Sequence, residues 1–304
     1  MRHRPRAEVA DHGGWGVGAG AVASSAATGV RHRSDGPPAV RALLADGYTA
    51  LPLADEAERA VARAFAEGRR FFALAEGERR AVAWAGWGRW CGYQPVPAGD
   101  AAVLDLVERF EAPMSALAPG GTAGPIWHPR RRGLRPTLID VMDLAVRSWR
   151  DVLEGLALAR GFDASAAHQL WLADHDSTVV VNHYPPDPAQ QLVMKPHRDF
   201  GGLSAVFLEA GGSGHLEFAG SDGWDRWHHD AGRSSCCLVV GELLAGWLDC
   251  PAPVHRVRST GEERLSIVAF HQPADGRLVP QGTGSAVVAG EHIQARQDHY
   301  NRLG

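Results

Sequence analysis

The chain has 304 residues, a formal net charge of −4 and four cysteines. This length allows one large domain with helical additions as readily as two domains. The weak charge gives no electrostatic case for a nucleic-acid partner, and no apolar run is long enough to span a membrane. The cysteines have no CxxC spacing, so we interpret them as reduced thiols of a cytoplasmic protein: Cys91, Cys236, Cys237 and Cys250.

The first part of the chain, taken in order, predicts a leader followed by helices. Residues 1–36 are basic and then glycine-rich, which we interpret as a flexible leader before a single domain at 37–304. Helical spacing begins at Pro37, and Gly47 is placed to stop that helix. A short strand is expected at 47–53, a helical run at 55–83 and a long helix at 136–162. The N-terminal helical part thus covers about 37–172.

An aromatic segment at 84–96 differs from its surroundings. It places Trp84, Trp87 and Trp90 among glycines and continues to Tyr93. Trp and Tyr give large, rigid contact areas, so Trp90 and Tyr93 are candidate substrate contacts. Ordinary burial where the helices meet the sheet is the alternative.

The second half changes to short apolar runs separated by Gly, Pro and Asp. Such a series predicts an all-β core, a jelly roll or barrel, at about 173–280, with helical additions on either side. The last of them is a C-terminal helix at about 290–303. The runs are TVVVNHY, LSAVFL, HLEFA, SCCLVVG and RLSIVAF.

A metal site is predicted from three residues in this half. On a β-strand, His197 and Asp199 would point to the same face, because positions i and i+2 do. A third ligand must come from elsewhere, and His255 is the best candidate. Two His and one carboxylate on one face of an iron are typical of non-haem Fe(II) oxygenases.

A site for an anion is predicted from residues that follow His255 closely in the sequence. Arg264 and Ser266 also share a strand face, and a guanidinium beside a hydroxyl suits a carboxylate. A carboxylate of the chain is the alternative partner. Glu263 would face away from Arg264, which leaves Glu262 as the competitor.

The ordered phrases NHYPP (182–186), HRD (197–199), VGEL (240–243), HRV (255–257) and RLS (264–266) together resemble the Fe(II)/2-oxoglutarate-dependent oxygenases. The resemblance is to the isopenicillin N synthase-like branch and runs from about Gly47 to the C-terminus. It implies a double-stranded β-helix (a cupin-like jelly roll) with Fe(II) and 2-oxoglutarate at its open mouth. Asn182 and Tyr184 would lie beside the iron, where Tyr184 can bond the cosubstrate, and Arg264 with Ser266 would bind its distal carboxylate.

The implied activity is the oxidation of a small molecule by O2, with hydroxylation, desaturation or ring closure as outcomes. Bacterial specialised metabolism, such as antibiotic biosynthesis, is the expected setting, and a monomer or weak homo-oligomer the expected state. Two rivals stay open: a same-fold oxidase that does not use 2-oxoglutarate, since isopenicillin N synthase itself carries Arg-x-Ser, and a metal-binding jelly roll without catalysis.

Strand alternation also proposes residues of the substrate pocket. Lys195 would share the face of His197 and meet an acidic group of the substrate, or else extend to water. Phe270 would share the face of Arg264, and Phe200 follows the metal motif directly. Five other histidines are interpreted as structural or solvated rather than as metal ligands: His183, His215, His228, His229 and His271.

Overall fold

A computed structural model describes residues 37–84, 91–96, 105–118, 126–186, 192–210, 215–228, 233–259, 261–282 and 284–302. These residues belong to one compact unit. The leader predicted at 1–36 lies outside the described residues, so that prediction stays open.

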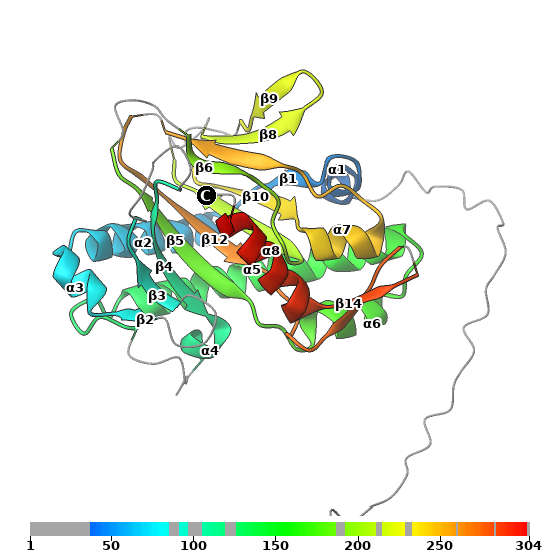
Figure 1. Ribbon diagram of the computed structural model, residues 1–304, viewed down its shortest axis with the longest axis horizontal. Coiled ribbons are helices and arrows are strands. Elements are labelled where there is room, and N and C mark those ends of the chain that lie inside the picture. Colours follow the sequence, from blue (N-terminus) through cyan, green and yellow to red (C-terminus); the bar gives the residue numbers. More distant parts are fainter. Residues whose placement is uncertain are drawn as a thin grey trace, which may run out of the picture. The chain divides into compact units, whose positions relative to one another are not determined.

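The core is built from two antiparallel sheets that face one another (Figure 1). The larger has the order β1-β10-β7-β12-β5-β4-β3-β2 and the smaller the order β6-β11-β8-β9. This is the double-stranded β-helix that the sequence predicts. The strands of the larger sheet are β1 (Tyr48–Leu51), β10 (Ser235–Val240), β7 (Leu203–Leu208), β12 (Arg264–Phe270), β5 (Thr178–Tyr184), β4 (Glu108–Pro113), β3 (Cys91–Gln94) and β2 (Ala83–Trp84). Those of the smaller are β6 (Leu192–His197), β11 (His255–Arg258), β8 (Leu216–Gly220) and β9 (Gly223–Arg226).

Alternation along the strands sends side chains into two separate cores. On β12, Leu265 and Ile267 pack with the helices, whereas Val268 packs with side chains of the smaller sheet. The helix-side core is formed mainly by α1 (Pro38–Asp46), α2 (Asp55–Phe72) and α5 (Leu134–Ala159). The barrel-side core lies between the two sheets and lines the interior in which the site is found.

The helix ends follow local chemistry. Gly47 adopts φ +78° and donates its N–H to the carbonyl of Leu43, so it stops α1 as predicted. The continuous helix predicted at 55–83 is wrong, because α2 ends at Phe72 and α3 (Glu76–Arg80) is separate. The Arg79 guanidinium donates to the carbonyls of Phe72 and Leu74, which satisfies acceptors that the broken helix leaves free.

Five further helices and a small hairpin complete the described elements. The helices are α4 (Met114–Leu117), α6 (Ala164–Ala167), η1 (His168–Leu172), α7 (Glu242–Leu248) and α8 (Ala289–Arg302), and the hairpin joins β13 (Leu278–Pro280) to β14 (Ala286–Val288). Helix α8, red in Figure 1, runs toward β6 and corresponds to the predicted C-terminal helix. Within the described residues, no helix has the length and apolar character needed to cross a membrane.

The four cysteines are free thiols, and all lie in the described part of the chain. Burial raises the pKa of Cys236 to about 12 and that of Cys91 to about 11. Thiols with such pKa values are protonated at neutral pH and poor nucleophiles. The cysteines therefore act as packing residues.

Candidate metal centre and cosubstrate pocket

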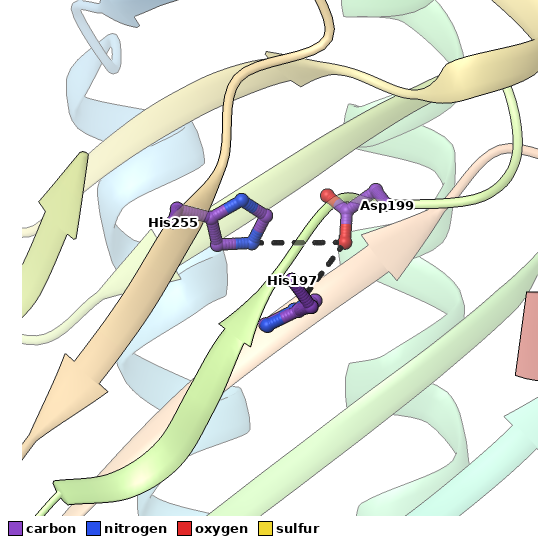
Figure 2. Close-up of side chains that lie close together, drawn as sticks. All are labelled: His197, Asp199 and His255. Carbon is purple, nitrogen blue, oxygen red and sulfur yellow. Dashed lines mark ion pairs between the residues drawn. The ribbon is translucent and has the colours of Figure 1, made fainter. Parts of the chain in front are cut away.

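His197, Asp199 and His255 come together at one end of the smaller sheet (Figure 2). His197 ends β6 and His255 begins β11, and the two are direct partners in the antiparallel register. The placement of Asp199 differs from the prediction, because β6 has already ended and the carboxylate lies in the turn that follows the strand. That turn is fixed from α7, where the N–H of Glu242 donates to the carbonyl of Asp199 at 2.8 Å.

The three side chains have the geometry of a shared ligand set. Asp199 Oδ1 lies 3.8 Å from His197 Nε2 and 3.7 Å from His255 Nε2, and all three ligand atoms lie within 4.8 Å of one another. Because a metal–ligand bond to N or O is about 2.1 Å long, two ligands of one ion are at most about 4.2 Å apart. The two Asp199 distances meet that limit.

In His197 and His255, the hydrogen bonds of the Nδ1 atoms fix the tautomers of the two rings. His197 Nδ1 lies 2.9 Å from the carbonyl oxygen of Lys195, and His255 Nδ1 lies 3.3 Å from that of Pro253. A nitrogen bonded to a carbonyl carries the proton, so each Nε2 presents its lone pair to the cluster. Burial, with His255 beside it, lowers the pKa of His197 to about 4, which keeps the ring neutral.

The carboxylate of Asp199 also indicates that this cluster suits a cation. Its Oδ2 is buried and has no hydrogen-bond partner, which is costly for a carboxylate unless an ion completes the site. Two neutral imidazoles and one carboxylate are the ligands of the facial iron site. In the described ranges, no other three His, Cys, Asp or Glu side chains lie close enough to share an ion.

A second polar group lies inside the barrel on β12 and β5. The register pairs Arg264 with Tyr184 and Ser266 with Asn182. Asn182 Nδ2 donates to Ser266 Oγ at 3.2 Å, and the Tyr184 hydroxyl lies 3.3 Å from the same oxygen. The Arg264 guanidinium stacks 3.7 Å from the centre of the Tyr184 ring. The structure thus brings together all four residues that the sequence assigns to the cosubstrate.

Arg264 is a buried cation that pairs with no anion among the residues that the structure describes. It is only 8% exposed, its Nε and Nη2 have no hydrogen-bond partner, and burial lowers its pKa. Glu262 is exposed and makes no ion pair with it, and Glu263 bonds His183 Nε2 at 2.8 Å instead. Neither carboxylate is therefore its partner. An unpaired buried charge is expensive, so the pocket suits a carboxylate brought by a small molecule.

The residues predicted to contact the substrate lie in different parts of the structure. Phe270 packs with the barrel-side core, on the face predicted for it. Lys195 and Phe200 both approach Tyr300 of α8. Tyr93 is buried against Phe71 in the helix-side core, which is the ordinary burial that the sequence analysis gives as the alternative. Trp90 lies outside the described residues.

Two residues near the site carry no sequence signal that singles them out. Tyr300 of α8 lies edge-on to the His197 ring, with centroids 5.4 Å apart. Its hydroxyl donates to Asp105, whose two carboxylate oxygens both lie 2.9 Å away. Asp105 stands 195 positions earlier in the chain, so only the tertiary fold reveals that α8 brings Tyr300 against a metal ligand.

Of the five histidines set aside by the sequence analysis, the four that the structure describes do not join the metal cluster. His183 bridges Glu108 and Glu263, and His271 is buried with its Nε2 on the carbonyl oxygen of Trp171. His215 is buried at the start of β8, and burial with Arg264 nearby lowers its pKa to about 4. His228 is exposed, and His229 lies outside the described residues.

Comparison with known proteins agrees with this site. Residues 175–273, which run from just before β5 to just after β12, match the model of the 2OG-Fe(II) oxygenase superfamily. No curated protein matches the chain. Many solved structures share the fold. A full-length Neurospora crassa protein in complex with alpha-KG has 19% identity and a TM-score of 0.72, over 86% of this chain and 88% of that one. A 2OG-Fe(II) oxygenase family protein from Caulobacter crescentus has 20% identity and a TM-score of 0.74, over 86% and 92%.

A third similar structure is the dioxygenase for auxin oxidation in rice, with 20% identity and a TM-score of 0.64, over 86% of this chain and 88% of that one. Two His and one Asp at one end of a jelly-roll sheet are the arrangement typical of non-haem iron oxygenases, which are oxidoreductases. The match to the 2OG-Fe(II) oxygenase superfamily model covers residues 175–273, the stretch that holds all three residues of the metal cluster. The isopenicillin N synthase-like branch stays a prediction.

Proposed function

We propose that the chain oxidises a small molecule with O2 and 2-oxoglutarate, with iron held by His197, Asp199 and His255. The observation that carries this proposal is Arg264, a buried guanidinium with unpartnered nitrogens. A 2-oxoglutarate molecule bound at the iron has a second carboxylate to offer such a cation. Iron(II), when bound, supplies the redox chemistry that couples decarboxylation of 2-oxoglutarate to oxidation of the substrate.

The protein's own residues would do three things. The carbonyls of Lys195 and Pro253 hold both imidazoles with Nε2 toward the ion. Arg264, with Ser266 and Tyr184 beside it, orients 2-oxoglutarate by its distal carboxylate. Tyr300 of α8, which lies edge-on to the His197 ring, would limit the access of water on that side of the metal.

The reaction on the primary substrate is hydroxylation, desaturation or ring closure. In hydroxylation, one oxygen atom of O2 enters the substrate and the other enters succinate, while the C1 carboxylate of 2-oxoglutarate leaves as CO2. The similar Neurospora crassa protein was also crystallised with alpha-KG and thymine, which supports a small-molecule substrate for this fold. The same-fold oxidase stays the alternative, because a carboxylate of the primary substrate could also pair with Arg264, and succinate formation distinguishes the two.

The biological setting is part of the proposal. Bacterial specialised metabolism is the setting that we propose. Four free thiols support a reducing compartment, the cytoplasm. The single domain at 37–304 and a monomeric or weakly associating state belong to the same proposal.

Succinate formation tests the function directly. The iron-loaded chain with 2-oxoglutarate and O2 should release succinate, and a panel of small molecules should reveal a substrate that stimulates its release. Asp199→Ala should abolish succinate formation, whereas Arg226→Gln, an exposed change on β9, should not alter it. O2 consumption without succinate would favour the oxidase instead.

A further inference from the structure

Lys195 is the single lysine of the chain, and the other thirty basic residues are arginines. It lies on β6, two residues before His197. The two side chains differ chemically. Arginine presents a planar fork that suits a permanent bidentate pair, whereas lysine is a compact charge on a flexible stem. The one position where this chain uses an ammonium is therefore beside the metal ligands.

The surroundings of Lys195 place its side chain at the mouth of the site. Its Nζ lies 4.3 Å from the centre of the Tyr300 ring, and the same ring lies edge-on to His197. Its carbonyl oxygen is the acceptor that fixes the His197 tautomer. The ammonium and the metal ligand are thus neighbours of one aromatic ring.

The ammonium lacks an anionic partner in the described part of the chain, where no carboxylate oxygen lies within the 4.0 Å of an ion pair. Asp105 is close but otherwise engaged. Its oxygens accept from the Tyr300 hydroxyl, from Arg109 at 2.9 Å and from the backbone N–H of Lys195 at 3.2 Å. Lys195 is half-buried, so its ammonium can meet a small molecule that enters the mouth.

We propose that Lys195 binds a carboxylate of the primary substrate, so that the substrate class is a small organic acid. This inference rests on the proposed function. The barrel then holds two cations with separate tasks: Arg264 takes the distal carboxylate of 2-oxoglutarate, and Lys195 takes the substrate. Arg109, the arginine nearest in this network, is paired with Asp105, and a single ammonium suits a single carboxylate better than a phosphate, which takes several donors. The Tyr300 ring offers an apolar surface beside that charge.

Because the chain has one lysine, amine labelling reports on this site directly. The full chain, loaded with Fe(II) and N-oxalylglycine under anaerobic conditions, is treated with the neutral reagent N-acetoxysuccinimide. Acetylation of Lys195 is then measured by mass spectrometry. The probes are small acids such as benzoate, phenylacetate and hexanoate, each compared with its carboxamide. We expect at least one acid to slow acetylation at a concentration about tenfold below that of its amide.

Variants separate charge from shape. In calorimetric titration, the preference for that acid over its carboxamide should fall about tenfold in Lys195→Met. Lys195→Arg should keep most of this preference. Arg226→Met, on the exposed face of β9, should leave it unchanged. Equal protection by acids and amides, or protection by no acid, would overturn the assignment. Binding of N-oxalylglycine to the same samples tests the proposed function separately: if it binds while no acid protects, the assignment of Lys195 alone is wrong.

Discussion

Replacing Arg264 by glutamine should weaken 2-oxoglutarate binding selectively. The guanidinium is 8% exposed and two of its nitrogens lack partners, so a bound carboxylate would gain a desolvated, charged contact. Losing one such contact typically costs about 2–5 kcal/mol. Since about 1.4 kcal/mol is tenfold in affinity, the dissociation constant should rise roughly thirtyfold to several thousandfold. Iron affinity should stay nearly unchanged, because Arg264 is not in the metal cluster.

The assay measures the KM for 2-oxoglutarate by succinate release and the Kd by anaerobic calorimetry of iron-loaded protein. Arg226→Gln is the matched control, because that arginine is exposed on β9 and should change either constant less than twofold. Thermal unfolding without ligands verifies that the Arg264→Gln chain is folded. Normal 2-oxoglutarate dependence combined with lost affinity for the primary substrate would refute the reasoning and favour the oxidase.

Three further predictions follow from the same structure. Asp199→Ala and His255→Ala should each lose stoichiometric Fe(II), measured by metal analysis after desalting; iron retained in both would contradict the ligand assignment. Thiol titration of denatured, unreduced protein should find four free thiols, and finding two would indicate a disulfide. Glu108→Gln should destabilise the fold by about 3–5 kcal/mol, as expected when a buried ion pair is broken, measured by urea unfolding. In the wild type, the contribution of the Glu108–His183 pair to the free energy of unfolding should be lost below pH 4.5 and above pH 6.5. In Glu108→Gln, the free energy of unfolding should depend less on pH.

The pH window follows from two opposed pKa shifts. Burial acts to raise the pKa of Glu108, but hydrogen bonds from His183 and Tyr93 outweigh it and hold the pKa below its usual 4.5. Burial acts to lower the pKa of His183, but its bonds to Glu108 and Glu263 outweigh it and raise the pKa above 6.5. The lowered Glu108 pKa contributes stability that is lost as pH falls. The raised His183 pKa contributes stability that is lost as pH rises, so the pair stabilises most between the two values.

Strand alternation was enough to predict the interior face of β12. Arg264, Ser266 and Phe270 lie on the barrel side because an uninterrupted strand keeps a period of two. The same reasoning was wrong in detail for Asp199, since β6 ends at His197 and the register against β11 shifts between His255 and Val257. The two ligands still converge, because a turn held by α7 replaces the strand geometry.

Contacts between distant segments could not be predicted from periodicity. Tyr300 reaches the metal ligands only because its hydroxyl meets Asp105 and because Arg296 of the same helix bonds Glu242 of α7 at 2.7 Å. No local pattern at 290–303 distinguishes this helix from one that packs elsewhere. The burial of Tyr93 likewise depends on tertiary contacts, because β3 turns that side chain toward the helices, where the hydroxyl donates to Glu108 at 2.5 Å.

Anaerobic titration of 2-oxoglutarate into the chain, with and without Fe(II), asks whether the metal cluster and the Arg264 pocket form one site. If they do, the chain should bind one iron and one 2-oxoglutarate, with 2-oxoglutarate binding much more tightly when iron is present. Equal binding with and without iron would show that the two are independent, and the absence of 2-oxoglutarate binding to the iron-loaded chain would contradict the proposed function outright.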